Sequence, residues 1–337
     1  MRHESSLKTL TAFATITLAA GSLSSAPAGN TIAKDVHRAR AVGLAMTRAA
    51  TARLSATTDP CSRAAELVAH ATIREAQEDF LIGLANCVNL TDPEEAFDCL
   101  HESIDELEET LEEAGEQYDA RMDLCSLLGG GAYDPEYDGD DFVQGIDNPL
   151  LPFVVGNTWT YEAETEDGME TVVVTVTPDT IDIDGVECTV VRDTVTLEGE
   201  LIEDTFDYFA QDVDGNVWYF GELSLNYEDG SLVDIDGSWI AGEEYAKPGI
   251  VMFAAPVVGT TYRQEFLIDE AEDAGTVLSL SEDVSVPAGS FTNCLQTVDF
   301  TPIEPDTFEW KYYQPGIGLL LEIDLESGER LELISFN

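Results

Sequence analysis

The spacing of four cysteines restricts the fold of this chain more than any other feature of its sequence. Twenty-six residues separate Cys61 from Cys87 (87 − 61) and also Cys99 from Cys125 (125 − 99). At about 3.6 residues per turn, this separation is about 7.2 turns, so each pair lies on nearly one face of a helix. Antiparallel packing of two such helices brings Cys61 beside Cys125 and Cys87 beside Cys99. The spacing therefore predicts a helical hairpin with a disulfide at each end.

Helix start and stop signals surround these cysteines. Thr58-Asp59-Pro60 and Thr91-Asp92-Pro93 each place an N-capping Asp before a proline at the first helical position. Apolar residues then recur at steps of three and four from Leu100 to Cys125, until Gly129-Gly130-Gly131 ends the pattern. We expect the hairpin over residues 59 to 128.

The remaining cysteines, Cys188 and Cys294, lie in the C-terminal half of the chain. Because the hairpin pairing uses four of the six cysteines, these two remain, and we expect them to form a third disulfide. A zinc site would need four cysteines at one place with C-x-x-C spacing, which is absent. Three disulfides leave no thiolate for catalysis.

Residues 1 to 28 have the pattern of a removable export signal. A basic start with Arg2 and Lys8 precedes the apolar run Leu10 to Ala20, and Ala26-Pro27-Ala28 matches a small-residue cleavage site. The apolar run is shorter than the roughly 20 residues of a transmembrane helix, and no later run reaches that length. We expect cleavage near Ala28 and a secreted or periplasmic product, in which disulfides can form.

Two further segments separate the expected units. Residues 29 to 58 hold five Lys and Arg against the single acid Asp35 in an otherwise acidic chain. A flexible basic leader is the favoured interpretation, and a helix lying on the acidic body or on a membrane surface is the alternative. Residues 129 to 147 are rich in Gly and Asp and are expected to form a linker.

Residues 148 to 337 change to an alternation of apolar and polar residues. Leu319, Leu321 and Ile323 alternate with Glu322 and Asp324. Two-residue turn signals recur at Asp184-Gly185, Asp214-Gly215, Asp229-Gly230, Asp236-Gly237 and Ser327-Gly328. We expect about nine to eleven antiparallel strands in meander order, curled into an open half-barrel, a barrel or a sandwich. The fold class is therefore α+β, with a disulfide-stapled antiparallel helical hairpin before an all-antiparallel β meander.

The net charge excludes several partners. The chain has 67 acidic and 15 basic residues, a formal net charge of −52. Nucleic acid and anionic lipid both present phosphates that require Lys and Arg, so neither is an expected partner. Such a surface suits saline surroundings, where counterions screen its self-repulsion.

Few residues have a pattern suited to catalysis. After the export signal the only histidines are His37, His70 and His101, and the hairpin register keeps the last two apart. This argues against a Ser-His-Asp or Cys-His hydrolase and against a His-ligated metal enzyme. A carboxylate pair could still hydrolyse glycosides, but the sequence does not single out two acids. We expect a protein that is not an enzyme.

Calcium is the one cofactor that the residue pattern suggests. Asp212, Asp214 and Asn216 place three oxygen-bearing side chains at alternating positions around a turn. However, the glycine comes too early for an EF-hand loop and no bidentate Glu follows at the twelfth position. An Asp-Gly hairpin turn explains the same residues without a metal, and the sequence favours it.

Aromatic residues gather in three places. These are Trp159 with Tyr161, Trp218 with Tyr219 and Phe220, and Trp310 with Tyr312 and Tyr313. Alternation puts Trp310 and Tyr312 on one face, where they could line a pocket for an apolar ligand or a sugar. Packing of the sheet core is the commoner role of such residues.

Two motifs carry a resemblance to a family. Asn148-Pro149-x-x-Pro152-x-x-x-Gly156-x-x-Trp159-x-Tyr161 and Lys311-Tyr312-Tyr313-x-Pro315-Gly316-x-Gly318 resemble the ends of a β domain of uncharacterised secreted bacterial proteins. The resemblance covers roughly the last 190 residues and implies no activity. A looser similarity to the curved open sheets of lipoprotein carriers concerns the fold alone.

These observations lead to one functional hypothesis and two alternatives. We expect an exported, non-catalytic binding or structural protein whose partner is a protein or a small ligand. The first alternative is a periplasmic carrier of a lipid-like molecule, which requires an elongated apolar cavity. The second is a carboxylate-dependent hydrolase, which requires a cleft with facing carboxylates of raised pKa.

Overall fold

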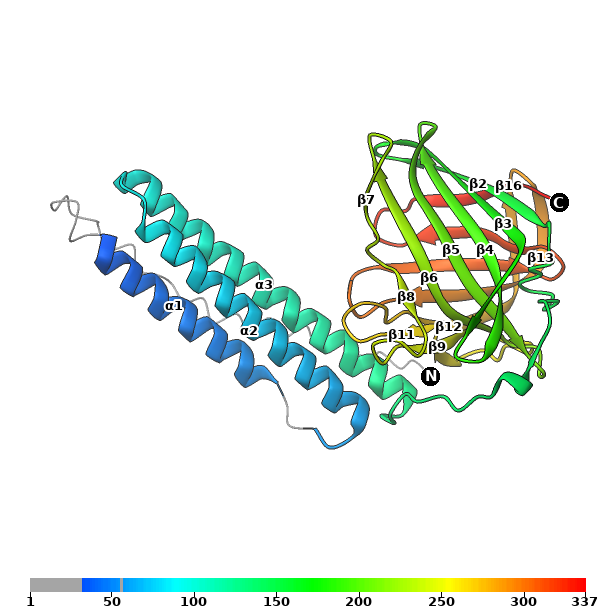
Figure 1. The fold of residues 1–337 in the computed structure, drawn as a ribbon, viewed down its shortest axis with the longest axis horizontal. Coiled ribbons are helices and arrows are strands. Elements are labelled where there is room, and N and C mark those ends of the chain that lie inside the picture. Colours follow the sequence, from blue (N-terminus) through cyan, green and yellow to red (C-terminus); the bar gives the residue numbers. More distant parts are fainter. Residues whose placement is uncertain (1–31, 55–56) are drawn as a thin grey trace, which may run out of the picture.

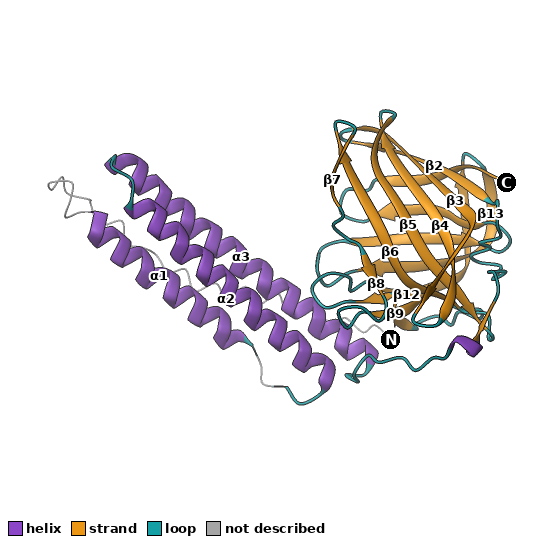
Figure 2. Ribbon diagram, in the orientation of Figure 1, coloured by secondary structure: helices purple, strands orange, loops and turns teal. Residues whose placement is uncertain are grey.

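A helical bundle and a β-barrel make up the described part of the protein (Figures 1 and 2). The computed structural model describes residues 32–54 and 57–337. The expected export signal and its cleavage site near Ala28 lie outside these residues. Among the described helices, none is long and apolar enough to cross a membrane.

The bundle consists of three helices, which are α1 (Ile32–Arg53), α2 (Pro60–Val88) and α3 (Pro93–Leu128). The expected caps are present, because Asp59 accepts a hydrogen bond from the Ser62 amide and Asp92 accepts one from the Glu94 amide. Gly129 ends α3 in the left-handed conformation, with φ of 84°.

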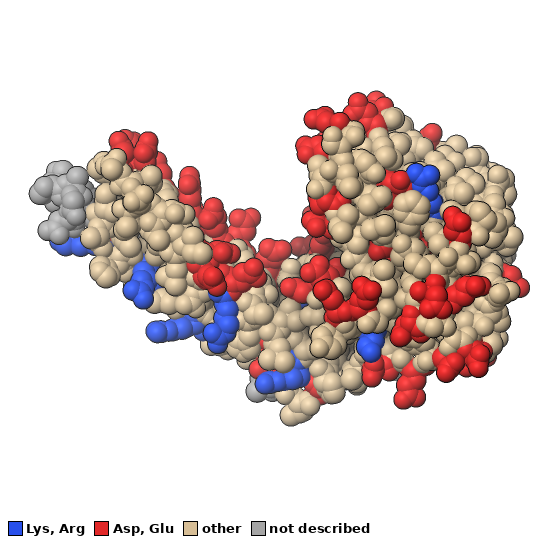
Figure 3. Space-filling model, in the orientation of Figure 1, with Lys and Arg blue, Asp and Glu red and all other residues tan. Residues whose placement is uncertain are grey.

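The prediction of a flexible leader is wrong for residues 32 to 53, which form α1. Ala39, Gly43 and Thr47 are spaced by four and form the buried stripe of this helix. These small residues let α1 approach the bundle closely, because a Cβ on Gly43 would lie only 2.2 Å from the Phe80 ring. Figure 3 shows the Lys and Arg side chains along the edge of the bundle that α1 occupies, while Asp and Glu line the edge of α3. The helix therefore lies on the acidic body, as the alternative interpretation proposed.

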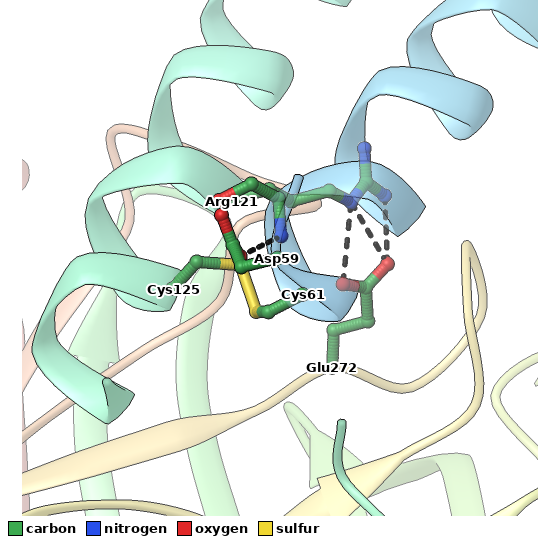
Figure 4. Close-up of a disulfide and its surroundings, with 6 residues drawn as sticks. Asp59, Cys61, Arg121, Cys125 and Glu272 are labelled. Carbon is green, nitrogen blue, oxygen red and sulfur yellow. Dashed lines mark hydrogen bonds and ion pairs between the residues drawn. A yellow bond between two sulfur atoms is a disulfide. The ribbon is translucent and has the colours of Figure 1, made fainter. Parts of the chain in front are cut away.

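Both disulfides of the hairpin are confirmed. Cys61 is bonded to Cys125 and Cys87 is bonded to Cys99, with Cα atoms 5.6 Å and 5.5 Å apart. The first disulfide holds the start of α2 against the end of α3, next to the barrel (Figure 4). The second one closes the far end of the hairpin.

Within the described residues, sixteen strands form one antiparallel sheet, and eleven of them have six residues or more. The long strands are β2 (Thr158–Thr165), β3 (Gly168–Ile183), β4 (Val186–Leu197), β5 (Glu200–Asp212), β6 (Val217–Glu228), β9 (Lys247–Met252), β12 (Ala274–Val286), β13 (Gly289–Phe300), β14 (Phe308–Gln314), β15 (Gly318–Asp324) and β16 (Arg330–Phe336). The short ones are β1 (Phe142–Val143), β7 (Ser231–Asp234), β8 (Trp239–Ile240), β10 (Thr261–Arg263) and β11 (Glu265–Phe266). The number of long strands agrees with the sequence-based expectation.

The sheet curls into a nearly closed barrel. Its strand order is β10-β12-β13-β14-β15-β16-β2-β3-β4-β5-β6-β9-β11, so the last strand of the chain pairs with β2. The two ends of this path are joined in sequence, because only Gln264 separates β10 from β11. Gly249 on β9 permits this closure, since a Cβ there would lie 2.4 Å from the carbonyl carbon of Gln264.

The segment between bundle and barrel is fixed to the barrel along its length. The Tyr133 hydroxyl donates to the Pro248 carbonyl at 2.8 Å, and the Tyr137 ring packs against Phe142 and Phe220. A 3-10 turn, η2 (Gly139–Asp141), then leads into β1, which pairs with β5.

The predicted disulfide between Cys188 and Cys294 is wrong. Both residues are buried free thiols. Cys188 lies on β4 and Cys294 on β13, and five other strands separate β4 from β13 in the sheet. The two side chains join different apolar clusters, so an even cysteine count did not determine their pairing.

Candidate functional site

Acidic side chains point into the barrel from β4, β5 and β6. Val191 and Leu320 belong to one apolar cluster inside the barrel, so the face of β4 that carries Val191 is the inner face. Asp193 lies two residues further along β4 and shares that face. The same face continues onto the next two strands. Val191 pairs with Asp207 on β5, and Asp207 pairs with Glu222 on β6. We call the group Asp193, Asp207 and Glu222 the first wall.

A second wall lies on β13, β14 and β15. Glu322 follows Leu320 by two residues and therefore also points inward. The Lys311 Nζ atom lies 3.0 Å from Glu309 Oε2, 3.2 Å from Glu322 Oε2 and 3.8 Å from Asp299 Oδ2. We call the group Asp299, Glu309, Lys311 and Glu322 the second wall. Its single cation is surrounded by three carboxylates.

The two walls face each other across the interior, and their charges interact. Burial, together with the charges of Asp207, Glu203 and Glu322, raises the pKa of Asp193 to about 8. Because Glu322 lies on the second wall, its effect on Asp193 acts across the barrel. The interior therefore holds more negative charge than its one lysine balances.

The first wall contains two further perturbed acids. Burial and the charge of Glu222 raise the pKa of Asp207 to about 7, although the Tyr219 hydroxyl donates to Asp207 at 2.7 Å. Burial also raises the pKa of Glu222 to about 7. Asp193, Asp207 and Glu222 nevertheless keep partial solvent exposure, so water reaches this part of the interior.

On the second wall, the carboxylates determine the state of the lysine. Burial alone lowers the pKa of Lys311, but Glu322, Glu309 and Asp299 outweigh burial and hold it well above its usual value. Burial raises the pKa of Glu322 despite the opposing effect of Lys311. Lys311 is thus permanently charged.

Several polar atoms of the interior have no hydrogen-bond partner. These are Oδ1 of Asp193, Oδ1 of Asp299 and Oγ1 of Thr297. Thr297 is only 1% exposed and Asp299 only 6%. Thr297 on β13 pairs directly with Lys311 on β14. Buried polar atoms are normally hydrogen-bonded, so these three mark positions for donors from water or a ligand.

One hollow of the barrel surface is lined by residues of the second wall, and a larger one lies at the barrel mouth. The larger hollow has a volume of about 1260 Å³ and lies at the barrel mouth, between the β2–β3 and β15–β16 turns. Glu170 lines it, and the charge of Glu170 helps to raise the pKa of Asp193. Its acidic lining residues are Glu162, Glu164, Glu166, Asp167, Glu170, Asp324, Glu326, Glu329 and Glu332. The smaller, of about 300 Å³, contains Asp299, Glu309 and Lys311. Both hollows are polar and acidic.

The three calcium candidates form a hydrogen-bonded turn. Asp212 accepts from the amide and the side-chain nitrogen of Asn216, both at 2.8 Å, and from Trp218 Nε1 at 2.9 Å. The Asn216 side-chain oxygen accepts from the Ala254 amide, and Asp214 is exposed. Among the described residues, no three His, Cys, Asp or Glu side chains form a group suited to a metal ion. These contacts support the hairpin-turn interpretation.

The histidines and aromatic residues from the sequence analysis do not join the walls. His70 lies 3.8 Å from Glu66, and His101 contacts the Phe97 carbonyl within α3. Trp159 is a core residue that donates to the Ile317 carbonyl at 2.7 Å. Trp310, the neighbour of inward-pointing Lys311, faces outward and is 37% exposed. Trp310 therefore lines neither the core nor an interior pocket.

Sequence reasoning missed both walls. Their acids alternate with apolar residues as exposed acids would, and the chain has 67 acids from which to choose. One signal was available, because Lys311 is one of only four lysines and lies between Glu309 and the aromatic pair Tyr312-Tyr313. A lone lysine within an acidic strand is a reason to examine its neighbours.

Comparisons with known proteins supply no family. No family model and no curated protein matches this chain. One solved structure, described as a "putative lipoprotein from Parabacteroides distasonis", is similar over 56% of this chain and 99% of its own, with 11% identity and a TM-score of 0.27. A likeness this weak carries no conclusion. The resemblance of residues 148–161 and 311–318 to secreted bacterial proteins stays a prediction.

Proposed function

We propose that this chain is an exported, non-catalytic binding protein whose barrel interior binds a small hydrophilic cation with several N–H donors. The observation that carries the proposal is the pair of facing walls, on which six carboxylates meet one lysine. Burial and mutual repulsion raise the pKa values of Asp193, Asp207 and Glu222, and a cation placed between the walls offsets that repulsion.

The distribution of the acids supports an extended ligand. The walls span six strands, β4 to β6 and β13 to β15, and neighbouring strands are about 4.8 Å apart. A linear polyamine offers N–H donors at intervals of several ångströms and can reach both walls. The unpartnered oxygens of Asp193, Asp299 and Thr297 are acceptors for such donors.

The alternative of a lipid carrier fits these hollows poorly. An acyl chain needs apolar walls, because displacing water from carboxylates without replacing their hydrogen bonds is costly. Acidic residues are prominent in the lining of both hollows.

The hydrolase alternative has one observation in its favour. Asp207 and Glu222 are cross-strand neighbours whose pKa values are both raised to about 7, as a general acid requires. A single-site test separates this alternative from binding. Hydrolysis of a panel of chromogenic glycosides that disappears in Asp207→Asn would establish an enzyme, and its absence is expected here.

Isothermal titration with spermidine at 150 mM salt tests the proposal. We expect saturable binding with release of protons, because a bound cation lowers the raised pKa values of Asp193, Asp207 and Glu222. Repeating the titration in two buffers of different ionisation enthalpy measures that release. Asp193→Asn and Asp299→Asn should each weaken binding about tenfold, since a charged hydrogen bond contributes about 1.5–3 kcal/mol.

The matched control is Asp179→Asn, which removes the same charge from an exposed position on β3. This control should change the affinity for spermidine by no more than about twofold relative to the unmodified chain. If this control weakens binding as much as Asp193→Asn does, spermidine is held by the general field of the protein and the proposal fails. An absence of proton release contradicts it as well.

A further inference from the structure

A third hollow, of different chemistry, lies where the bundle meets the barrel. It has a volume of about 320 Å³, and α2, α3, the segment after α3 and the loop after β11 contribute to its lining. Apolar side chains form most of the wall, among them Ala64, Val68, Leu128, Phe266 and Ile268. The exposed residues Gly131 and Ala132 lie at its rim, so solvent has access.

Two buried arginines line this hollow in a protein that has very few basic residues. Arg121 on α3 is 5% exposed, and Arg263 on β10 is 6% exposed. Arg121 pairs with Glu272, to which its Nε and Nη2 atoms donate at 3.0 Å and 2.8 Å (Figure 4). It also lies 3.2 Å from Asp269. The carboxylate of Glu272 is thereby committed to Arg121.

Arg263 has no such partner. Its Nε and Nη1 atoms are buried and make no hydrogen bond. The guanidinium stacks over the Phe266 ring at 4.4 Å and lies 5.7 Å from the Tyr133 ring, which orients it without supplying an acceptor. Burial lowers the pKa of Arg263, with Glu272 offsetting this only in part. A buried guanidinium with free N–H groups is rare, because each such group loses its hydration without replacement.

We propose that this hollow binds small amphipathic carboxylates, with the carboxylate on Arg263 and the apolar chain against α2 and Phe266. An arginine held flat by aromatic rings presents its N–H groups in the fork geometry that matches a carboxylate. The apolar walls select an organic anion over an inorganic one, since sulfate or chloride gains nothing from contact with Val68 or Ile268. The site is separate from the barrel interior, whose walls are acidic.

Octanoate is a suitable probe because it combines one carboxylate with a short apolar chain. Isothermal titration of the full chain at 150 mM salt should give 1:1 binding, and acetate and octan-1-ol should each bind at least tenfold more weakly. Acetate lacks the chain and octan-1-ol lacks the charge. Equal binding of octan-1-ol would show an apolar pocket with no role for Arg263 and would overturn the proposal.

Two variants locate the site. Arg263→Gln removes the charge and should weaken octanoate binding at least tenfold. The control is Arg192→Gln, because Arg192 lies on the outer barrel face and pairs with Asp204. It should leave octanoate binding unchanged. Ala64→Leu narrows the hollow and should also weaken octanoate binding tenfold, with Arg263 intact. If Arg263→Gln does not fold, Ala64→Leu and the comparison with octan-1-ol still test whether octanoate binds in this hollow through its carboxylate. Octanoate affinity that survives Ala64→Leu contradicts the proposal.

The test is independent of the cation proposal. Spermidine binding should be the same in Ala64→Leu as in the unmodified chain, because the substitution lies outside the barrel interior. Loss of octanoate binding together with intact spermidine binding is the expected pattern.

Discussion

The bundle and the barrel place their acidic residues in opposite ways. In the bundle, acids cover the outside and the core is built from Ala, Leu, Ile and Phe. Within the described helices, the buried acid is Glu66, whose Oε2 atom lies 2.6 Å from the Nη1 atom of Arg63. In the barrel, acids point inward from both walls, and one carboxylate oxygen each of Asp193 and Asp299 lacks a hydrogen-bond partner. A buried polar atom without a partner is costly, so the barrel interior carries a cost that the bundle avoids by pairing its buried charge.

The two regions also differ in how they are held together. Small residues such as Ala65, Ala69 and Ala76 give the bundle a thin core, and two disulfides compensate for it. The barrel has a larger apolar core and a continuous ladder of strand pairs, and both of its cysteines stay reduced. Burial raises the pKa of Cys188 to about 12, which makes its thiol unreactive.

Reduction of the disulfides should produce the largest difference between the regions. The Cys61–Cys125 bridge spans 64 residues, and closing a loop of that size contributes on the order of 4 kcal/mol in the chain-entropy account. The four tryptophans all lie in the barrel, so their fluorescence reports the barrel while helical circular dichroism reports the bundle. Reductant should shift only the helical transition to lower urea. Equal shifts in both signals would mean that the two regions unfold together.

The pH dependence of barrel stability should be the next largest effect. Asp193, Asp207 and Glu222 have folded-state pKa values near 7 to 8, so between about pH 4 and pH 8 the folded barrel holds protons that the unfolded chain has released. Stability should therefore fall as pH rises through this window, by up to about 1.4 kcal/mol per pH unit for each group. Urea unfolding followed by tryptophan fluorescence at pH 5, 7 and 9 measures the slope. Asp193→Asn should flatten it, and a slope unchanged by that substitution would contradict the description of the first wall.

A substitution at the α1 contact should have a smaller effect, confined to the bundle. Gly43→Ala places a methyl group against the buried Phe80 ring and should cost about 1–3 kcal/mol, more than the helix-propensity gain of about 1 kcal/mol. Gly115→Ala on α3 is the matched control, because its methyl group would meet only the flexible end of Arg53. Thermal unfolding at 222 nm should show destabilisation by the first change alone. A neutral Gly43→Ala would mean that α1 does not pack closely.

Divalent cations should produce the smallest difference. The Asp212 carboxylate already accepts three hydrogen bonds, so calcium and magnesium at equal concentration should raise the melting temperature almost equally by screening the negative charge. A calcium-selective rise that disappears in Asp212→Asn would instead establish a calcium site at this turn.

The helical hairpin was predictable because its signals are local. The Asp-Pro caps, the glycine stop and the 26-residue cysteine spacing each follow from helix geometry, whatever surrounds them. The strands and their turns were predictable for the same reason, since alternation and Asp-Gly pairs are short-range features.

Non-local pairings were not predictable from the sequence. Alternation assigns Asp193 and Arg192 to opposite faces but does not say which face is inside, because that depends on the direction in which the sheet curls. The pairing of Cys188 and the docking of α1 likewise depend on distant partners, such as Phe80 for Gly43. The charge asymmetry of residues 29 to 58 hinted at α1, but composition alone did not distinguish a docked helix from a flexible leader.

The position of β16 has a consequence for how the protein is assembled. Most neighbouring long strands in the sheet are also consecutive in sequence, but β16 pairs with β2 as well as β15 and so joins the two halves of the meander. Until residues 330 to 336 have been synthesised, β2 and β15 are both sheet edges that lack one partner strand, and such edges favour aggregation. A chain that begins to fold during synthesis must therefore wait for β16, and the interval between the synthesis of β2 and that of β16 is when aggregation through these edges is most favoured.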